Sequence, residues 1–414
     1  MHGNYQAGSS SINTNFIKCL IISFFGFGVA FIFGLNMPTY SLTALIVALF
    51  LLTILGWPFN VLSINYIMKF ILLSYFVILF YTISFGYDYI AARSFFTNTC
   101  LIIGAYIAGR SIDIKLLPGG IYNLTAIILA MIAGLVAFSY LTVRATLFAS
   151  PQDILYAREV QSFWDASPLS ATNIGIFYSL GLSIFPALIY VGTIKTKHFY
   201  QILFAVSIIL LVTVSMYVGL LMQNRSPYVS LVTSFVLTLI IGRKYLFDIV
   251  KKHVIAVFLL IALLIISSIL LYSEGGLIWD MIGSRFDYKG LESERYTAWY
   301  YMLVNMFDNP MGGKVTYIGD LNYVHNLWLD VAFKAGLIPM IFLILFHALH
   351  VKDFLSILKS RLSLFVKAVV VCVATSFLIS FAVEPVMEAS TLLFAASCFF
   401  LGTVSFISDN MKYF

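Results

Sequence analysis

The stretch FYQILFAVSIILLVTVSMYVGLL, from Phe199 to Leu221, contains no charged residue. As one helix it is long enough to cross the roughly 30 Å hydrocarbon core of a bilayer. Outward from it, comparable apolar runs lie at 19–35, 40–57, 70–90, 95–109, 121–142, 173–194, 226–242, 254–272, 324–350, 368–383 and 390–407. The sequence therefore predicts an all-α, polytopic membrane protein, with about twelve transmembrane helices in a single integral membrane domain over residues 1–414.

The composition agrees with this fold class, because 61% of the residues are hydrophobic and only 10% are charged. An ordinary soluble domain has about 25% charged residues. The formal net charge of +6 does not indicate a nucleic-acid partner, because Lys and Arg gather mostly in short connections between the expected spans. The four cysteines all lie in apolar runs without the spacing of a metal site, so neither disulfides nor a bound metal is expected.

The distribution of charge also predicts how the chain is oriented. Short connections rich in Lys and Arg, including the one expected to hold Lys69, mark the cytoplasmic face, and most acidic residues fall in the other set of connections. The N-terminal segment 1–18 lacks the pattern of a cleaved signal peptide. We therefore expect both termini in the cytoplasm and the two long connections, 143–172 and 273–323, on the outer face, where function is expected to lie.

Each long connection contains a segment that predicts a helix of its own. In SPQDILYAREVQSFWDA, residues 150–166, apolar residues alternate with acids and bases, which is typical of a short helix lying in the membrane interface. In the second connection, aromatic residues recur at helical spacing between a capping residue, Ser293, and the Asn309-Pro310 pair. We expect this second helix to carry part of the functional site.

Three arginines on the expected outer face are candidates for binding a phosphate or diphosphate, because the planar fork of a guanidinium suits such a group. Arg225 lies in a tight connection between two spans, Arg295 opens the loop helix, and Arg285 precedes it. Alternatives remain for each residue. Arg225 suits an anchor to lipid phosphate, and Arg285 suits a solvated loop charge. Arg295 suits a surface pair with neighbouring acids, Glu292 and Glu294.

His325 is the one histidine expected on the outer face, where an imidazole can accept a proton near neutral pH. The others, among them His347 and His350, are expected at the cytoplasmic ends of spans. The alternative is a satisfied interface histidine. His325 lies at the start of a helix predicted over 324–350. At 1.5 Å per residue this helix is about 40 Å long, which is more than the hydrocarbon core requires. Its first turns can therefore line a polar, outward-facing vestibule. On this helix Asp330 and Lys334, spaced i and i+4, are expected to pair with each other. Gly336 is expected to allow another helix or a lipid to approach closely.

Together these residues favour transfer of a group from a diphosphate leaving group. Because the sequence contains neither a Cys/His metal cluster nor an Asp-x-Asp motif, we expect no metal or other cofactor, with arginines stabilising the leaving diphosphate. His325 is the expected base that deprotonates a hydroxyl acceptor. Aromatic residues near the vestibule, Trp299, Tyr300 and Trp328, are candidates for stacking on sugars.

The segments RYTAWYYMLVNMFDNPMGG and VHNLWLDVAFKAGLIP resemble the shared signature of the O-antigen ligase and O-antigen polymerase superfamily of bacterial inner membranes. That signature has an arginine, a tryptophan, a Pro with a glycine-rich turn, then His-Asn, nine residues and a glycine. The corresponding residues here are Arg295, Trp299, Pro310, Gly312, Gly313, His325, Asn326 and Gly336. NRSPYVSLV likewise resembles a family segment, with Arg225 in the matching place.

The resemblance implies a fold similar to the C-type glycosyltransferases and metal-independent transfer of a glycan from undecaprenyl diphosphate at the periplasmic face. By that resemblance His325 is the base, Arg225 and Arg295 bind the diphosphate, and Asn326 and Gly336 belong to the same site. The expected partners are an undecaprenyl-diphosphate-linked oligosaccharide, membrane lipid and a chain-length regulator protein.

Two departures from the ligase pattern favour a polymerase, which extends lipid-linked repeats in lipopolysaccharide biosynthesis. Pro339 stands where ligases have Gly, Thr or Tyr, and Arg225-Ser226-Pro227 replaces Ser-Arg-Gly. The alternative within the family is a ligase that transfers the glycan to lipid A-core. From other classes, a polar-lipid transporter or flippase suits a chain of many spans equally well, and a membrane scaffold is a third possibility. The crowding of candidate residues on one face favours the enzyme over the transporter.

Overall fold

The computed structural model describes Val29 and the ranges 63–85, 89–110, 121–149, 159–194, 198–222, 224–252, 294–312, 324–384, 386–389 and 391–411. Except for Val29, the predicted spans at 19–35, 40–57 and 254–272 lie outside the described residues.

Within these ranges, eight helices are long and apolar enough to span a membrane, which confirms the expected all-α, polytopic class. They are α3 (Ile64–Phe85), α5 (Ile121–Ala149), α6 (Ala171–Ser183) continued by the 3-10 helix η5 (Phe185–Thr193), α7 (His198–Met222), α8 (Ser226–Lys252), α13 (Leu337–Lys359), α14 (Leu364–Val383) and α16 (Thr391–Asp409). The span predicted at 95–109 is also helical, within α4 (Tyr89–Arg110). Three shorter helices lie between the long ones: α11 (Glu294–Asn305), α12 (Leu327–Ala335) and α15 (Val386–Ala389).

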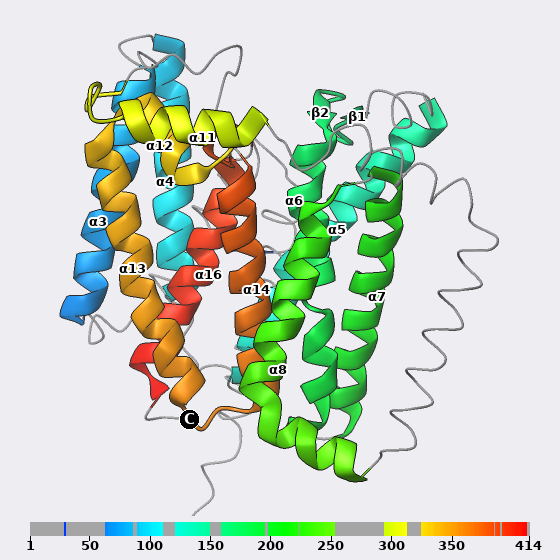
Figure 1. The fold of residues 1–414 in the computed structure, drawn as a ribbon. Helices are drawn as coiled ribbons and strands as arrows, with labels where there is room; N and C mark the ends of the chain where they lie inside the picture. The colour runs from blue at the N-terminus through cyan, green and yellow to red at the C-terminus, as the bar shows by residue number, and fades with distance from the viewer. Residues whose placement is uncertain are drawn as a thin grey trace, which may run out of the picture.

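The long helices form a bundle with two sides (Figure 1). On one side α3, α4, α13 and α16 pack together, on the other side α5 to α8 do so, and α14 lies between them against α6, α8 and η5 (Figure 1). A helix satisfies all its backbone hydrogen bonds internally, as hydrocarbon requires. The backbone N–H groups at the start of a helix need other partners, and a serine side chain supplies one at the start of α6 and of α14. Ser170 accepts from Asn173 N at the start of α6, and Ser363 accepts from Val366 N at the start of α14.

Two glycines allow α4 and α16 to approach closely. A Cβ on Gly109 would lie 2.0 Å from the carbonyl oxygen of Phe399, and a Cβ on Gly402 would lie 2.3 Å from the carbonyl oxygen of Tyr106. Small residues at a helix crossing let the two backbones pack at short range, which is a common way to join helices in a membrane.

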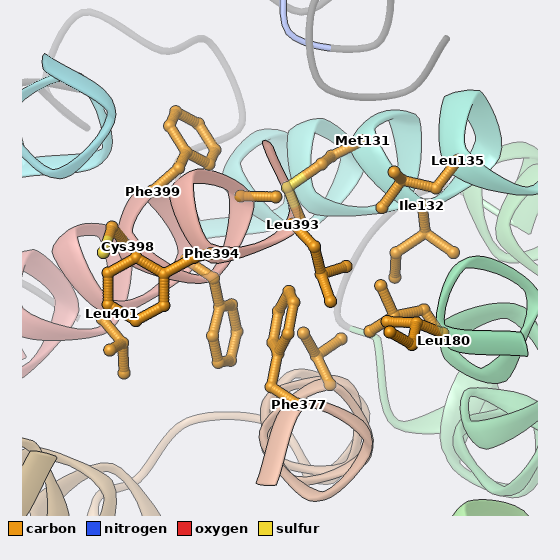
Figure 2. Close-up of a cluster of buried hydrophobic side chains, with 14 of the residues drawn as sticks. Met131, Ile132, Leu135, Leu180, Phe377, Leu393, Phe394, Cys398, Phe399 and Leu401 are labelled. Atoms are coloured by element: carbon orange, nitrogen blue, oxygen red, sulfur yellow. The ribbon is translucent and has the colours of Figure 1, made fainter. Parts of the chain in front are cut away.

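The centre of the bundle is an apolar cluster that joins its two sides (Figure 2). Leu393 and Phe394 of α16 meet Phe377 of α14, and Met131 of α5 and Leu180 of α6 complete the cluster (Figure 2). All five of these side chains are at most 4% exposed. The core therefore depends on helices from both halves of the sequence.

A buried polar network joins α3, α4, α13 and α16. Lys69 Nζ donates to Asp353 Oδ2 at 2.5 Å and to Ser405 Oγ at 3.2 Å, and the Lys69 side chain is fully buried. Arg110 pairs with Asp409 at 2.5 Å. We expected Lys69 in a cytoplasmic connection; that prediction is wrong, because Lys69 lies inside α3, where a buried carboxylate from α13 compensates its charge.

The expected position of two histidines at the end of a span is also wrong. His347 and His350 lie well inside α13, which continues to Lys359 because Phe354, Leu355 and Ile357 extend its apolar pattern. His350 is 1% exposed, and its Nδ1 lies 2.8 Å from the carbonyl oxygen of Phe346.

The helix predicted over 150–166 is wrong for the residues that the structure describes. Two short antiparallel strands occur instead, β1 (Glu159–Gln161) and β2 (Pro168–Ser170), with Val160 opposite Leu169. Only Val160 of β1 is buried, as the twofold periodicity of a strand requires. Asp165 lies in the turn between the strands. Hydrogen bonds from Ser162 and Ser167 stabilise its carboxylate and so lower the pKa of its carboxyl group.

Candidate functional site

The loop helix predicted before Pro310 is confirmed as α11, and it lies across one end of the bundle, near α12 and the end of α14 (Figure 1). We call this end of the bundle the α11 end. Arg295, in the first turn of α11, donates from Nη1 to the carbonyl oxygen of Val383 at 2.7 Å. Its Nη2 lies 3.7 Å from Glu384 Oε2, and the Glu384 side chain is only 3% exposed. Arg295 therefore caps α14 and pairs with a buried carboxylate, a partner that the sequence argument did not consider.

His325 lies in a short, tightly bonded segment just before α12. Its φ of +57° is in the left-handed region, which is uncommon for a residue other than glycine. On its N-terminal side, the Val324 carbonyl oxygen accepts a hydrogen bond from Trp299 Nε1 at 2.8 Å. On its C-terminal side, Asn326 caps α12 by accepting from Leu329 N at 3.2 Å. Both neighbours of His325 are thus held by the rest of the site.

Asp330, on the first turns of α12, binds the backbone on both sides of His325. Its Oδ1 accepts from Val324 N at 2.5 Å and its Oδ2 accepts from Asn326 N at 3.1 Å. A strained φ costs about 1–3 kcal/mol. A hydrogen bond to a charged group contributes about 1.5–3 kcal/mol, so two such bonds are sufficient to hold the His325 conformation.

The segment of His325 and the guanidinium of Arg295 meet at the last carbonyl groups of α14. Asn326 Nδ2 donates to the carbonyl oxygen of Ala382 at 3.1 Å, next to the Val383 carbonyl oxygen that Arg295 uses. The signature residues Arg295 and Asn326, far apart in the sequence, therefore bind successive carbonyl groups of one helix end. His325 is half-buried beside them.

The electrostatic surroundings of His325 favour the neutral imidazole. Burial, and secondarily the positive charge of Arg295, lower the pKa of His325 to about 4. The side chain is therefore uncharged at neutral pH and able to accept a proton. Because the folded state binds this proton less readily than the unfolded chain, His325 leaves stability unaffected well above pH 6.5 and reduces it as the pH falls from about 6.5 toward 4.

This leads to a prediction for the titration of His325. NMR of the imidazole, assigned with a His325→Gln variant, is expected to give a pKa near 4 in the wild-type chain. In an Arg295→Gln variant the pKa is expected to rise, but to stay below the ordinary value of 6.5, because burial is the larger cause. A pKa at or above 6.5 in the wild type would contradict this description of the site.

The single helix predicted over 324–350 is wrong, because the chain breaks at Gly336 between α12 and α13. Gly336 has φ +91° and ψ −178°, a conformation that is essentially restricted to glycine. The cause of the break is the turn that follows α11, whose Pro310 carbonyl oxygen accepts from Leu337 N at 2.8 Å. Gly336 does allow a close approach, as expected, but of the Pro310–Gly312 turn and not of a helix or lipid.

Substituting Gly336 by alanine is expected to be destabilising. The backbone conformation alone would cost about 1–3 kcal/mol, and the new Cβ would lie 2.4 Å from the Pro310 carbonyl oxygen. Gly192 provides a matched control, because a Cβ there would approach only the Tyr245 hydroxyl, at 3.5 Å. Thermal unfolding in detergent should show a lower midpoint for Gly336→Ala and little change for Gly192→Ala. Equal midpoints would contradict the argument.

Arg225 immediately precedes α8, and hydrogen bonds between helices show at which end of the bundle it lies. Ser179 Oγ of α6 bonds both Ser230 Oγ of α8, at 3.0 Å, and Ser376 Oγ of α14, at 3.2 Å. These three serines mark one level in the bundle. Arg225 lies five residues before Ser230 in the chain, and Val383 lies seven residues after Ser376. At 1.5 Å per residue these are about 7.5 and 10 Å.

The two segments rise in the same direction because α8 and α14 are antiparallel. The far end of η5 meets the start of α14, where Phe365 N donates to Thr193 Oγ1 at 3.1 Å. The Tyr190 hydroxyl of η5 donates to the carbonyl oxygen of Thr238, midway along α8 and beyond Ser230 in the chain. Arg225 and Val383 therefore lie at similar depth on helices packed side by side, whose axes in such packing are about 8–10 Å apart.

The predicted aromatic residues have different surroundings. Tyr300 is 67% exposed on α11, so it is accessible at the α11 end. Trp299 is half-buried and holds Val324, as described above. Trp328 points into the bundle, where its Nε1 donates to His347 Nδ1 at 3.1 Å. Arg285 lies outside the described residues, and so does Ser293.

No protein-family model matches the chain, and no curated protein matches it significantly.

The sequence argument missed two acidic residues of the site. Glu384 follows a long apolar span directly, and a carboxylate at such a boundary was a signal that it has a cationic partner. Asp330 was assigned to a helix-surface pair with Lys334, although Asp four residues after an Asn cap is also well placed to bind backbone N–H groups.

A groove of about 710 Å³ between α5 and α7 is separate from this site. It is lined by the first half of each helix, including Tyr122 of α5 and Tyr200 of α7. The last turns of α5 adjoin β1, through the hydrogen bond from Gln161 N to Thr146 Oγ1, and β2 leads into the start of α6. The groove therefore lies toward the end of the bundle away from His325.

Proposed function

We propose that the chain is an O-antigen polymerase that transfers a growing glycan from undecaprenyl diphosphate to the non-reducing end of a lipid-linked repeat unit. The observation that carries this proposal is the meeting of Arg295 and the His325 segment at the end of α14, with Arg225 at similar depth on the adjoining helix. A fixed cationic pair beside a neutral imidazole suits a diphosphate donor and a hydroxyl acceptor.

In the proposed reaction His325 takes the proton of the acceptor hydroxyl as its oxygen attacks the anomeric carbon of the donor glycan. The bond between that carbon and the diphosphate oxygen breaks, and undecaprenyl diphosphate leaves with the electron pair. The charge that develops on the diphosphate is stabilised by Arg225 and Arg295. The proton then passes from His325 to the departing diphosphate or to water, which restores the neutral imidazole.

The low pKa of His325 fits a reaction in which the donor diphosphate binds before the acceptor hydroxyl is deprotonated. An imidazole with a pKa near 4 is a weak base in the free protein. Burial is the larger cause of the low pKa, and the charge of Arg295 is the second. A bound diphosphate would offset the charge of Arg295 and raise the pKa of His325 toward the working pH, where base catalysis is more effective. Donor binding would thus prepare the base for the acceptor.

The proposal includes about twelve spans and a fold similar to the C-type glycosyltransferases. It also places the protein in the bacterial inner membrane, with the α11 end facing the periplasm. The basic and acidic residues of the sequence support this orientation, through the excess of Lys and Arg in the connections at the other face. A chain-length regulator protein and membrane lipid are the proposed partners. A ligase that transfers to lipid A-core would use the same site.

The test is reconstitution of the purified chain in vesicles that contain lipid-linked repeat units. The proposal expects products of two or more joined repeats, detected by mass spectrometry. Lipid A-core as the sole acceptor would favour the ligase. Movement of the lipid-linked repeat between leaflets without any new glycosidic bond would favour the transporter and contradict the proposed enzyme.

A further inference from the structure

The conformation of His325 depends on a residue that does not reach the proposed substrate. His325 has a left-handed φ of +57°, and the backbone N–H groups of the residues before and after it, Val324 and Asn326, both point at the Asp330 carboxylate. Asp330 is 1% exposed. Its two oxygens each take one N–H, so the carboxylate closes a small ring around His325.

The ring is anchored to the rest of the bundle at both ends. Val324 is fixed through its carbonyl group by Trp299 of α11, and Asn326 is fixed through its side chain by the Ala382 carbonyl of α14. The Asp330 carboxylate bonds both backbone amides that flank His325. This carboxylate therefore helps to fix the backbone from which the imidazole projects.

We propose that Asp330 is a positioning residue for His325: by holding the amides of Val324 and Asn326 it keeps the imidazole aimed at the acceptor hydroxyl. This inference builds on the proposed function, in which His325 is the base. Asp330 acts through geometry, since its two carboxylate oxygens bond the backbone amides on either side of His325. An asparagine is nearly the same size but offers one acceptor oxygen, so it would satisfy one amide and place an NH2 group against the other.

The first experiment compares Asp330→Asn with the wild type in the glycan-transfer assay. We expect kcat to fall roughly 10- to 100-fold, because a misplaced catalytic group loses about that much. The KM for the lipid-linked donor should change little, because Arg225 and Arg295 are intact. Asp308→Asn is the matched control, since Asp308 is exposed in the turn after α11, and it should behave as the wild type. Wild-type kcat in Asp330→Asn would overturn the inference.

Asp330→Glu keeps the charge but moves the carboxylate by one methylene, so an intermediate kcat is expected. It also covers the case in which Asp330→Asn does not fold: full activity of Asp330→Glu would then overturn the inference.

A second experiment separates this inference from the proposed function, because it measures stability and needs no substrate. Glycine adopts a left-handed φ without strain. The loss of unfolding temperature caused by Asp330→Asn should therefore be larger in a His325→Gly background than in the wild type, where release of the strained His325 φ offsets part of the lost hydrogen bonding. Equal losses in the two backgrounds would mean that Asp330 does not hold the His325 conformation. If the losses differ as expected but His325→Ala retains full transfer activity, the proposed function fails while the structural role of Asp330 stands.

Discussion

A His325→Ala variant is expected to lose most of its glycan-transfer activity, with kcat reduced by about 10²- to 10⁴-fold, the usual contribution of a general base. The reason is that no other described histidine lies at the α11 end: His198 begins α7 at the opposite end, and His347 and His350 lie inside α13. The KM for the donor should change little, because the proposed diphosphate ligands remain. The measurement is the rate of repeat joining in reconstituted vesicles at saturating donor.

His198→Ala is the control for this prediction. His198 is exposed, and its Nδ1 lies 3.1 Å from Gln201 Oε1, so its loss should affect neither activity nor yield. A His325→Ala variant that joins repeats at the wild-type rate would show that another group accepts the proton. Loss of activity together with loss of folded protein would instead indicate that His325 is needed for the fold, and thermal unfolding distinguishes the two results.

Removing one member of the buried Lys69–Asp353 pair is expected to have the largest effect on stability. An Asp353→Ala variant leaves the Lys69 ammonium fully buried without its carboxylate, and breaking such a pair costs about 3–5 kcal/mol. The unfolding midpoint in detergent should fall markedly. A Lys69→Met, Asp353→Leu double variant replaces both charges by apolar side chains of similar size. It should recover most of the loss, because no unpaired charge remains.

The double variant also tests why the pair is there. If it is as stable as the wild type and active, the ion pair fixes helix positions without being required for stability. If Asp353→Ala alone is as stable as the wild type, Lys69 must reach water or another acceptor in the single variant, and the description of this network would be wrong.

Most of the fold class was predictable, because a membrane imposes one strong rule. Each span must be a helix of sufficient apolar length, and runs such as Phe199–Leu221 satisfy that rule without reference to their neighbours. The same was true of α11, whose aromatic spacing and terminating turn are local signals. The coarse class and the existence of α11 therefore followed from the sequence.

Features that depend on contacts between distant segments were not predictable. Gly336 ends α12 because the Pro310–Gly312 turn packs against it, and only the structure brings the turn to that position. Lys69 is buried because Asp353, in another span, compensates it. A reading based on residue type places both residues incorrectly, since a glycine inside an apolar run suggests helix packing and a lysine near a span suggests an interface.

The candidate site was predictable in its residue types but not in its contacts. The signature named Arg295, His325, Asn326 and Gly336, and the structure brings the segments that carry them together. The signature did not name Glu384, the buried acid that pairs with Arg295, or Asp330, the buried acid that holds the His325 segment. Local signals existed for both, a carboxylate directly after an apolar span and an Asp four residues after an Asn cap, but neither signal identifies the group that the acid binds.

The most direct measurement of the central claim is an experimental structure of the chain with undecaprenyl diphosphate bound. The account predicts that the diphosphate contacts the guanidinium groups of both Arg225 and Arg295, with the His325 imidazole facing the position of the departing glycan. A diphosphate bound elsewhere, or held by only one of these arginines with His325 turned away from it, would contradict the account.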